Sequence, residues 1–387
     1  MIYQLGTFPR KCKKHLIMSG SRTDSVVHSP NLTTPLQDVV SSQTYADYLL
    51  IWKKQLEKWK HDFEERYNRI QTVKESIDNY ELLKVLGEGG FGRVVLARHK
   101  HTQQLTAIKI MNKERVVKKK QVAHVIEERK IFQSVRYSFI VELLSAFKDK
   151  ANLYLQMEVC YGGEMYHLLS KQRHFDETLT KFYVSQVILA FEYLHHLDII
   201  HRDLKPDNVL IGEDGYCKLA DFGLAKRVSG RTFSLCGTPF YLAPEILGQK
   251  GYGKAAEYWA MGVFTYELLA GIPPFYSENE MEMYAKIMSC RFEMPTHFSL
   301  HVKEFISALL EVDLSKRIGN LHRGFDDIKT HAWFRKIQWE KVHEKAYKPP
   351  WLPPLGQKEE FKTMIKIRDI PLDTSLVDLH TETFQLF

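Results

Sequence analysis

Residues 200–208 read Ile-His-Arg-Asp-Leu-Lys-Pro-Asp-Asn, and an Asp-Phe-Gly triplet follows at residues 221–223. This order places a carboxylate (Asp203), an amine (Lys205) and an amide (Asn208) in one short loop, with a second carboxylate close behind. Phosphoryl transfer needs a carboxylate to receive the hydroxyl proton, a cation near the γ-phosphate and oxygen ligands for Mg²⁺. The stretch therefore predicts a phosphoryl-transfer site, in which Asn208 and Asp221 hold the metal.

A glycine-rich turn lies upstream, between two predicted strands. It reads Gly87-Glu88-Gly89-Gly90-Phe91-Gly92-Arg93-Val94. Glycines let the backbone approach phosphates closely enough for N–H groups to bind them. Because a strand follows and not a helix, the pattern favours a lid over ATP and argues against a dinucleotide-binding site.

Lys109 lies between apolar residues of the strand that comes after this turn. Alone it could be an edge-strand lysine reaching water. Its distance from the glycine turn instead favours a contact with the α- and β-phosphates. Glu128, on the next predicted helix, is the expected ion-pair partner, since the adjacent Glu127 would point about 100° away.

Ser234 lies between the Asp-Phe-Gly triplet and an Ala-Pro-Glu triplet at residues 243–245. A phosphate on Ser234 would carry about −1.5 to −2 charges and attract nearby cations. Candidate partners are Arg202, Lys226 and His124. An unmodified loop serine is the alternative.

Bulk composition is that of a globular protein: 387 residues, 44% hydrophobic, 26% charged. A net charge of +7 could indicate nucleic-acid binding. However, Lys and Arg are scattered, and the densest run, residues 113–120, is expected on the solvated face of a short surface helix. We therefore expect no nucleic-acid partner.

Cysteine usage and hydropathy predict location. The five cysteines are widely spaced and form no Cys-x-x-Cys pair, which indicates free thiols in a reducing compartment. The sequence contains no apolar run long enough to span a membrane and no secretory signal core at its start. A cytoplasmic location with access to the nucleus is expected.

The chain divides into four parts. Residues 1–43 are predicted to be a flexible tail. Residues 44–79 should hold a helix that docks on the rest of the protein, with a coiled coil as the alternative. Its apolar residues step by three and four and so share one face: Leu49, Trp52, Leu56, Trp59 and Phe63.

An α+β architecture with two lobes follows. Five predicted strands and one helix, at about residues 118–134, form a small antiparallel lobe over residues 80–157. Residues 158–163 are the predicted hinge. A mainly helical lobe covers residues 164–334, and a tail covers 335–387.

These motifs resemble the AGC group of Ser/Thr protein kinases, and within it the catalytic subunits of cyclic-AMP-dependent protein kinase. Further matching stretches are residues 162–165, 235–239, 241–245 and 312–317. The resemblance implies a bilobal kinase fold that uses ATP and two Mg²⁺ ions. It also implies nucleotide contacts from Val94, Ala107, Met157, Glu158, Cys160 and Glu164.

Substrate choice is also implied by the resemblance. Glu164, Asp207 and Glu267 fall at positions that bind arginines two and three residues before the target serine. Leu235, Pro239 and Leu242 would form a pocket for an apolar residue after it. Phe233 and Tyr284 match positions that face a cyclic-AMP-binding regulatory subunit, which is the expected partner.

Three further expectations are structural or regulatory. The resemblance implies an ion pair between Glu245 and Arg317. Phe384 and Phe387 should pack into the small lobe and brace the Glu128 helix. Ser375 is a second phosphorylation candidate.

Departures from the family pattern keep two alternatives open. Asp207 replaces a glutamate, Glu257 replaces an aspartate that holds the catalytic loop, and Phe240 replaces an acidic residue. The Phe-Asp-Asp-Tyr motif of the family tail is absent. The alternatives are an AGC kinase without cyclic-nucleotide control and a nucleotide-binding pseudokinase scaffold.

Overall fold

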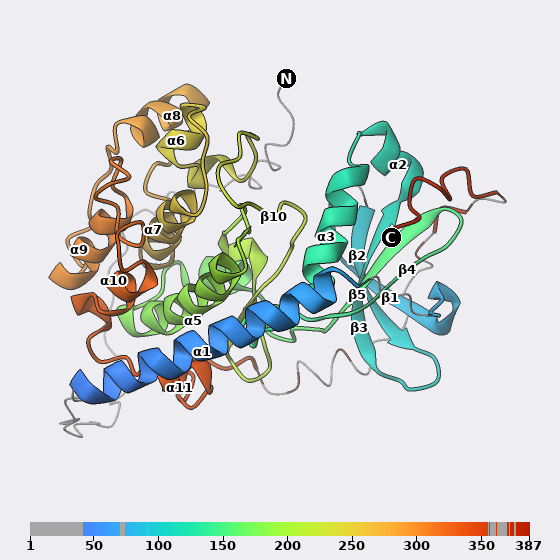
Figure 1. Ribbon diagram of the computed structural model, residues 1–387, viewed down its shortest axis with the longest axis horizontal. Coiled ribbons are helices and arrows are strands. Elements are labelled where there is room, and N and C mark those ends of the chain that lie inside the picture. Colours follow the sequence, from blue (N-terminus) through green and yellow to red (C-terminus); the bar gives the residue numbers. More distant parts are fainter. Residues whose placement is uncertain are drawn as a thin grey trace, which may run out of the picture.

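The computed structural model describes residues 42–69, 74–90, 92–354, 356, 361, 370, 372–374 and 377–387. The predicted tail of residues 1–43 therefore lies outside the described residues except for its last two, which begin a helix. Phe91 and Ser375 also lie outside them. The described chain forms the two expected lobes, a β-sheet lobe and a helical lobe (Figure 1).

Five antiparallel strands build the small lobe in the order β1-β2-β3-β5-β4. Their bounds are β1 (Tyr80–Glu88), β2 (Gly92–His99), β3 (Leu105–Asn112), β4 (Leu143–Lys148) and β5 (Asn152–Met157). The helix expected at about 118–134 is present as α3 (Val122–Ser134), and the short surface helix expected at residues 113–120 is present as α2 (Lys113–Lys118). The backbone between them adopts φ +55° at Lys120, which separates the two helices.

The large lobe is built around two long buried helices, α5 (Glu177–His196) and α7 (Ala255–Ala270). The Asp176 side chain caps α5 by accepting from the Leu179 N–H, and Gly271 ends α7 at φ +79°. The remaining helices are α4 (Met165–Gln172), α6 (Pro244–Leu247), α8 (Glu280–Met288), α9 (Leu300–Leu309), α10 (Phe325–Lys329) and α11 (Trp339–His343).

Short strands in the large lobe hold the site loops. β8 (Val209–Ile211) pairs with β6 (Gly163–Glu164) and β9 (Cys217–Leu219), and β7 (Ile199–Ile200) pairs with β10 (Lys226–Arg227). Strands of two or three residues are too short to show a periodic pattern. The sequence prediction missed all five.

Helix α1 (Ser42–Tyr67) runs alongside both lobes and packs against α3 and α5 (Figure 1). Its predicted apolar face is the docked face: Trp52, Leu56 and Phe63 are buried, and Leu49 and Trp59 are half-buried against the same core. The rings of Trp52 and Trp59 meet edge-to-face at 5.5 Å. Docking on the chain's own surface therefore accounts for the helix.

The last residues of the chain return to the small lobe. Phe384 and Phe387 are buried there, and the Arg129 guanidinium on α3 lies 5.3 Å from the Phe387 ring centroid. Lys113 is buried, with Nζ 2.6 Å from Asp378 Oδ2. The expectation that residues 113–120 form only a solvated face is therefore wrong at Lys113, because the tail covers it.

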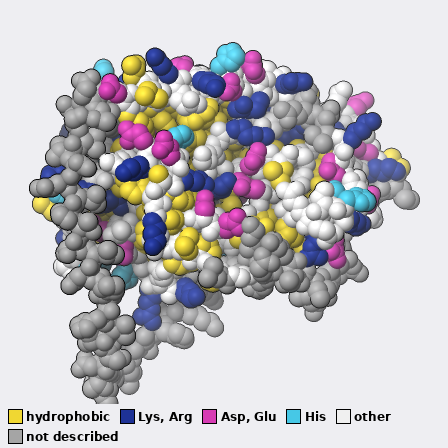
Figure 2. All heavy atoms as spheres, turned by 90° about the horizontal axis from the view of Figure 1, so that it is seen from below, with side chains coloured by type: hydrophobic (Ala, Val, Ile, Leu, Met, Phe, Trp, Pro, Cys, Tyr) yellow, Lys and Arg dark blue, Asp and Glu magenta, His cyan; other side chains and the backbone are white. Residues whose placement is uncertain are grey.

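Within the described residues, no helix is both long enough and apolar enough to cross a bilayer. Basic and acidic side chains are intermixed over the described atoms of the face in Figure 2.

Candidate active site

The carboxylate of Asp203 is held by polar groups from two segments. Thr238 Oγ1 donates to Asp203 Oδ1 at 2.7 Å, and Asn208 Nδ2 donates to Oδ2 at 2.8 Å. Lys205 Nζ lies 3.2 Å from the same Oδ2. Burial alone would lower the pKa of Lys205, but Asp203 and Asp207 raise it, so its ammonium stays charged.

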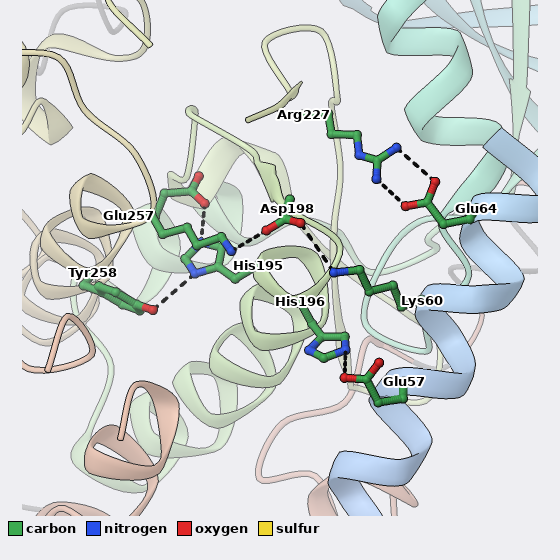
Figure 3. Close-up of polar contacts among 10 residues, drawn as sticks. Glu57, Lys60, Glu64, His195, His196, Asp198, Arg227, Glu257 and Tyr258 are labelled. Atoms are coloured by element: carbon green, nitrogen blue, oxygen red, sulfur yellow. Dashed lines mark hydrogen bonds and ion pairs between the residues drawn. The ribbon is translucent and has the colours of Figure 1, made fainter. Parts of the chain in front are cut away.

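The loop that carries Asp203 is itself fixed by Glu257 of α7. Glu257 Oε1 accepts from the backbone N–H groups of His201 and Arg202, at 2.7 and 2.8 Å. Its second oxygen lies 2.6 Å from His195 Nε2 (Figure 3). Arg202 adopts φ +71°, a strained backbone for a non-glycine residue, which these bonds hold in place.

The predicted pair of Lys109 and Glu128 is present. Lys109 Nζ lies 2.6 Å from Glu128 Oε1 and 3.2 Å from Asp221 Oδ1. The Lys109 charge lowers the pKa of Asp221 to about 2. Glu127 instead accepts a hydrogen bond from Tyr67 on α1.

Strand register brings the predicted nucleotide-facing side chains together. Val94 lies opposite Lys109, and Ala107 lies opposite Met157. Opposed residues and residues two apart point to one side of a sheet, so these four share a face.

Two kinds of glycine occur in the glycine-rich turn. A Cβ on Gly92 would lie 1.7 Å from the Ile110 carbonyl oxygen, so this position needs glycine for packing. A Cβ on Gly87 would meet no atom within 4 Å. Gly89 N–H donates to Gly92 O at 2.8 Å and closes the turn. Open space at Gly87 fits a backbone that faces a ligand, with Glu88 and Gly90 on the same turn.

Side-chain contacts brace the hinge. Glu158 Oε1 lies 2.6 Å from Lys218 Nζ and accepts from the Glu142 N–H at 2.8 Å. Cys160 is half-buried. Phe361 of the tail meets the hinge residue Tyr161 edge-to-face, with ring centroids 5.9 Å apart. A tail contact near the nucleotide face is therefore present without the family's Phe-Asp-Asp-Tyr motif.

The predicted cations gather around Ser234. Arg202 NH1 donates to Ser234 Oγ at 2.6 Å, and Lys226 Nζ donates to Thr232 Oγ1, which lies 3.5 Å from the same Oγ. Partial burial and the charges of Arg202 and Lys226 lower the pKa of His124. Arg202 thus contacts the Ser234 hydroxyl directly and Lys226 lies one hydroxyl away from it, a setting that favours an added phosphate.

The acidic residues predicted to bind substrate differ in burial. Asp207 is exposed and Glu164 is half-buried, whereas Glu267 is buried and accepts from the Tyr241 hydroxyl. Burial raises the pKa of Glu267 to about 7, and the Asp207 charge adds to the rise. Phe240 is buried and stacks on Tyr276, at 5.7 Å between ring centroids.

The residues predicted to form an apolar substrate pocket lie on the segment just before α6. Pro239 and Leu242 are buried and Leu235 is half-buried. Arg317 and Glu245 form the expected pair, at 2.7 and 3.0 Å in a bidentate arrangement. Both side chains are buried, so this pair fixes the start of α6.

The sequence matches the protein kinase domain family over residues 80–334, about two thirds of the chain. This chain belongs to the protein kinase family.

Relatives place this kinase more narrowly. The human cAMP-dependent protein kinase catalytic subunit PRKX is 40% identical over 291 residues, covering 74% of this chain and 81% of the relative. The Saccharomyces cerevisiae cAMP-dependent protein kinase type 3 is 41% identical over 289 residues, covering 75% and 73%. The Drosophila melanogaster catalytic subunit 3 is 42% identical over 288 residues, which span 73% of this chain and about half (49%) of that relative. The kinase is therefore an AGC-group Ser/Thr protein kinase, similar to these catalytic subunits.

Protein kinases use ATP and Mg²⁺, and the residues present fit both. Asp221 offers an ionised carboxylate whose side chain is 53% exposed, and Asn208 offers an amide oxygen. Among the described residues no group of three or more His, Cys, Asp or Glu side chains could hold a metal. Proteins usually hold Mg²⁺ through one or two side chains together with substrate phosphates.

Sequence reasoning missed several residues of this kinase site. Thr238 and Tyr241 were predicted only as parts of stretches that match the family. The Thr238 hydroxyl donates a hydrogen bond to Asp203, and the Tyr241 hydroxyl donates one to Glu267. His195 and Arg227 belong to no recognised motif. Their partners, Glu257 and Glu64, lie 62 and 163 positions away in the sequence. Separations of this size leave no signal in a single sequence.

Proposed function

We propose that this kinase transfers the γ-phosphoryl group of ATP to Ser or Thr in peptides of the form Arg-Arg-x-Ser-apolar. The observation that carries the proposal is the Asp203 carboxylate, fixed by Thr238 and Asn208 with Lys205 beside it. A carboxylate held in this way can orient a hydroxyl and take its proton. The intact set argues against the pseudokinase alternative.

Each side chain has a distinct task in this mechanism. Asp203 orients the substrate hydroxyl and accepts its proton, and Lys205 steadies the γ-phosphate oxygens. Lys109, held by Glu128, positions the α- and β-phosphates. Asn208 and Asp221 supply oxygen ligands for two Mg²⁺ ions. When bound, ATP would supply the phosphoryl group, and the Mg²⁺ ions held by Asn208 and Asp221 would offset negative charge in the transition state.

Recognition of arginine rests on Glu164, Asp207 and Glu267. Arginine pairs with carboxylates through parallel hydrogen bonds, which are among the stronger polar contacts in proteins. The apolar residue after the serine would contact Leu235 and Leu242.

Control by a cyclic-AMP-binding regulatory subunit is part of the proposal. The similar proteins are named cAMP-dependent kinases. Phe233 is 71% exposed, which suits a residue that faces a partner. The free cysteines of the described chain (Cys160, Cys217, Cys236, Cys290) accord with the proposed cytoplasmic and nuclear location.

The test is phosphate transfer from Mg-ATP to an Arg-Arg-x-Ser-apolar peptide, with Asp203→Ala as the blank. Turnover that the blank lacks supports the proposed chemistry, and about 1–100 s⁻¹ is typical of the class. Nucleotide binding without turnover, in protein phosphorylated at Ser234, contradicts it. Inhibition by an added regulatory subunit, reversed by cyclic AMP, supports the proposed control. Turnover without such inhibition would instead favour the alternative of an AGC kinase that lacks cyclic-nucleotide control.

A further inference from the structure

The last turns of α1 carry a binding site for one arginine side chain, that of Arg227. Arg227 NH1 lies 3.1 Å from Glu64 Oε2, and NH2 bonds the other Glu64 oxygen (Figure 3). The guanidinium carbon lies 5.7 Å from the Phe63 ring centroid and 5.2 Å from that of Tyr67. A bidentate carboxylate and two aromatic rings together restrict the position of the guanidinium more than a single surface ion pair would.

Arg227 lies on the segment that joins Asp221 to Ser234. It belongs to β10, where it pairs with Ile199 of β7, directly before the catalytic loop. The next residue, Val228, donates its N–H to Asp198 O at 2.7 Å. The site on α1 therefore fixes β10 where it pairs with β7, the strand that leads to the catalytic loop and Asp203.

The same turns of α1 also hold α3. Tyr67 Oη donates to Glu127 Oε1 at 2.8 Å, and Arg66 Nε donates to Ser134 O at 2.8 Å. Glu127 is the neighbour of Glu128, the partner of Lys109. One short stretch of α1 thus contacts both elements that must be placed together for Lys109, Glu128 and Asp221 to meet.

We infer that Glu64 is a positioning residue for phosphoryl transfer, which acts by fixing Arg227 and thereby the segment between Asp221 and Ser234. Glu64 touches neither substrate nor nucleotide residues. Without its carboxylate, Arg227 would lose both hydrogen bonds that fix its guanidinium to α1. The segment could then adopt arrangements that do not place Asp221 correctly.

The test compares Glu64→Gln with Glu65→Gln. Glu65 is the neighbouring glutamate, and its side chain is 71% exposed. Its Oε1 lies 4.0 Å from His61 Nδ1, a weak contact. We expect Glu64→Gln to lower kcat about fivefold, the size of a well-placed ion pair. The KM values for ATP and peptide should change less than about twofold, because Glu64 contacts neither. Glu65→Gln should match the unaltered kinase. Equal kcat in Glu64→Gln and Glu65→Gln would overturn the inference.

A charge exchange separates positioning from a general loss of folding. The single variants Glu64→Arg and Arg227→Glu should each lower kcat, and the double variant Glu64→Arg/Arg227→Glu should recover most of it. A double variant no more active than the singles would also overturn the inference.

Hydrogen exchange provides a readout that does not depend on the peptide. The inference rests on kinase activity but not on the proposed substrate sequence. In Glu64→Gln, the amides of residues 226–228 should exchange faster, while those of α7 should not. Exchange at residues 226–228 equal to that of the unaltered chain contradicts the inference even if the proposed peptide proves to be a poor substrate.

Discussion

The carboxylate of Glu257 lies 2.6 Å from His195 Nε2, while its other oxygen holds the catalytic loop. Glutamate is one methylene longer than the aspartate expected at this position. His195 takes up that extra length, and both side chains are buried. The longer residue therefore keeps both backbone hydrogen bonds to the loop. The departure at Glu257 gives no support to a loss of catalysis.

Glu257→Ala should destabilise the kinase strongly. It leaves the buried N–H of His201 and the partly buried N–H of Arg202 without acceptors, at about 1–3 kcal/mol each. We expect the free energy of unfolding to fall by about 2–6 kcal/mol in urea titration. Glu278→Gln, on an exposed loop, is the matched control and should change it by less than about 0.5 kcal/mol. A loss below about 1 kcal/mol in Glu257→Ala would show that the loop does not depend on this carboxylate.

Ser234→Ala should lower kcat by about tenfold relative to the Ser234-phosphorylated kinase. A phosphate here would contact Arg202, and a charge-assisted hydrogen bond contributes about 1.5–3 kcal/mol. Turnover of the Ser234→Ala and Ser229→Ala variants should be compared, since Ser229 is an exposed serine of the same segment. Equal turnover of the two would rule out a role for the phosphate.

Recognition of arginine should depend on pH through Glu267. Its pKa is raised to about 7, so its carboxylate is mostly protonated at pH 6 and mostly charged at pH 8. Since arginine binds the charged form, KM for an Arg-Arg-x-Ser peptide should fall about tenfold as pH rises across that range.

Two controls isolate Glu267 in that experiment. A peptide with alanine in place of both arginines should show no such fall, and Glu267→Gln should flatten the profile for the arginine peptide. An unchanged profile in Glu267→Gln would assign the pH dependence to another group.

Phe384→Ala should destabilise the kinase by about 3–5 kcal/mol, because the ring is fully buried against the small lobe. The Leu379 side chain is 81% exposed, so Leu379→Ala serves as the control. Thermal unfolding monitored by circular dichroism can compare the two. A midpoint for Phe384→Ala equal to that of Leu379→Ala would mean that the tail is not anchored by this residue.

Motif spacing was enough to predict two contacts at the centre of the site, the ion pair of Lys109 with Glu128 and the placement of Arg202 near Ser234. The pair of Glu245 with Arg317, which the family resemblance implied, is also present. The docked face of α1 was predicted because 3.6-residue periodicity depends only on neighbouring residues.

Contacts between distant segments could not be predicted in this way. Lys113 looked like part of a solvated charge run, because its partner Asp378 lies 265 residues away. Arg227 and Glu64 are likewise ordinary surface residues by type. Their roles arise from the packing of segments that local patterns do not place relative to one another.

Helix α1 also bears on how much of the chain can be isolated intact. The family match starts at Tyr80, yet Trp52 and Phe63 belong to the same continuous core as the large lobe. A fragment cut to residues 80–334 would expose the apolar surface that these rings cover. It would also expose the buried Lys329–Glu192 pair to water, because the rings of Tyr48 and Trp52 that lie against Lys329 would be missing. Such a fragment would tend to precipitate when expressed alone. The segment that matches the family model is thus smaller than the segment that shares one hydrophobic core.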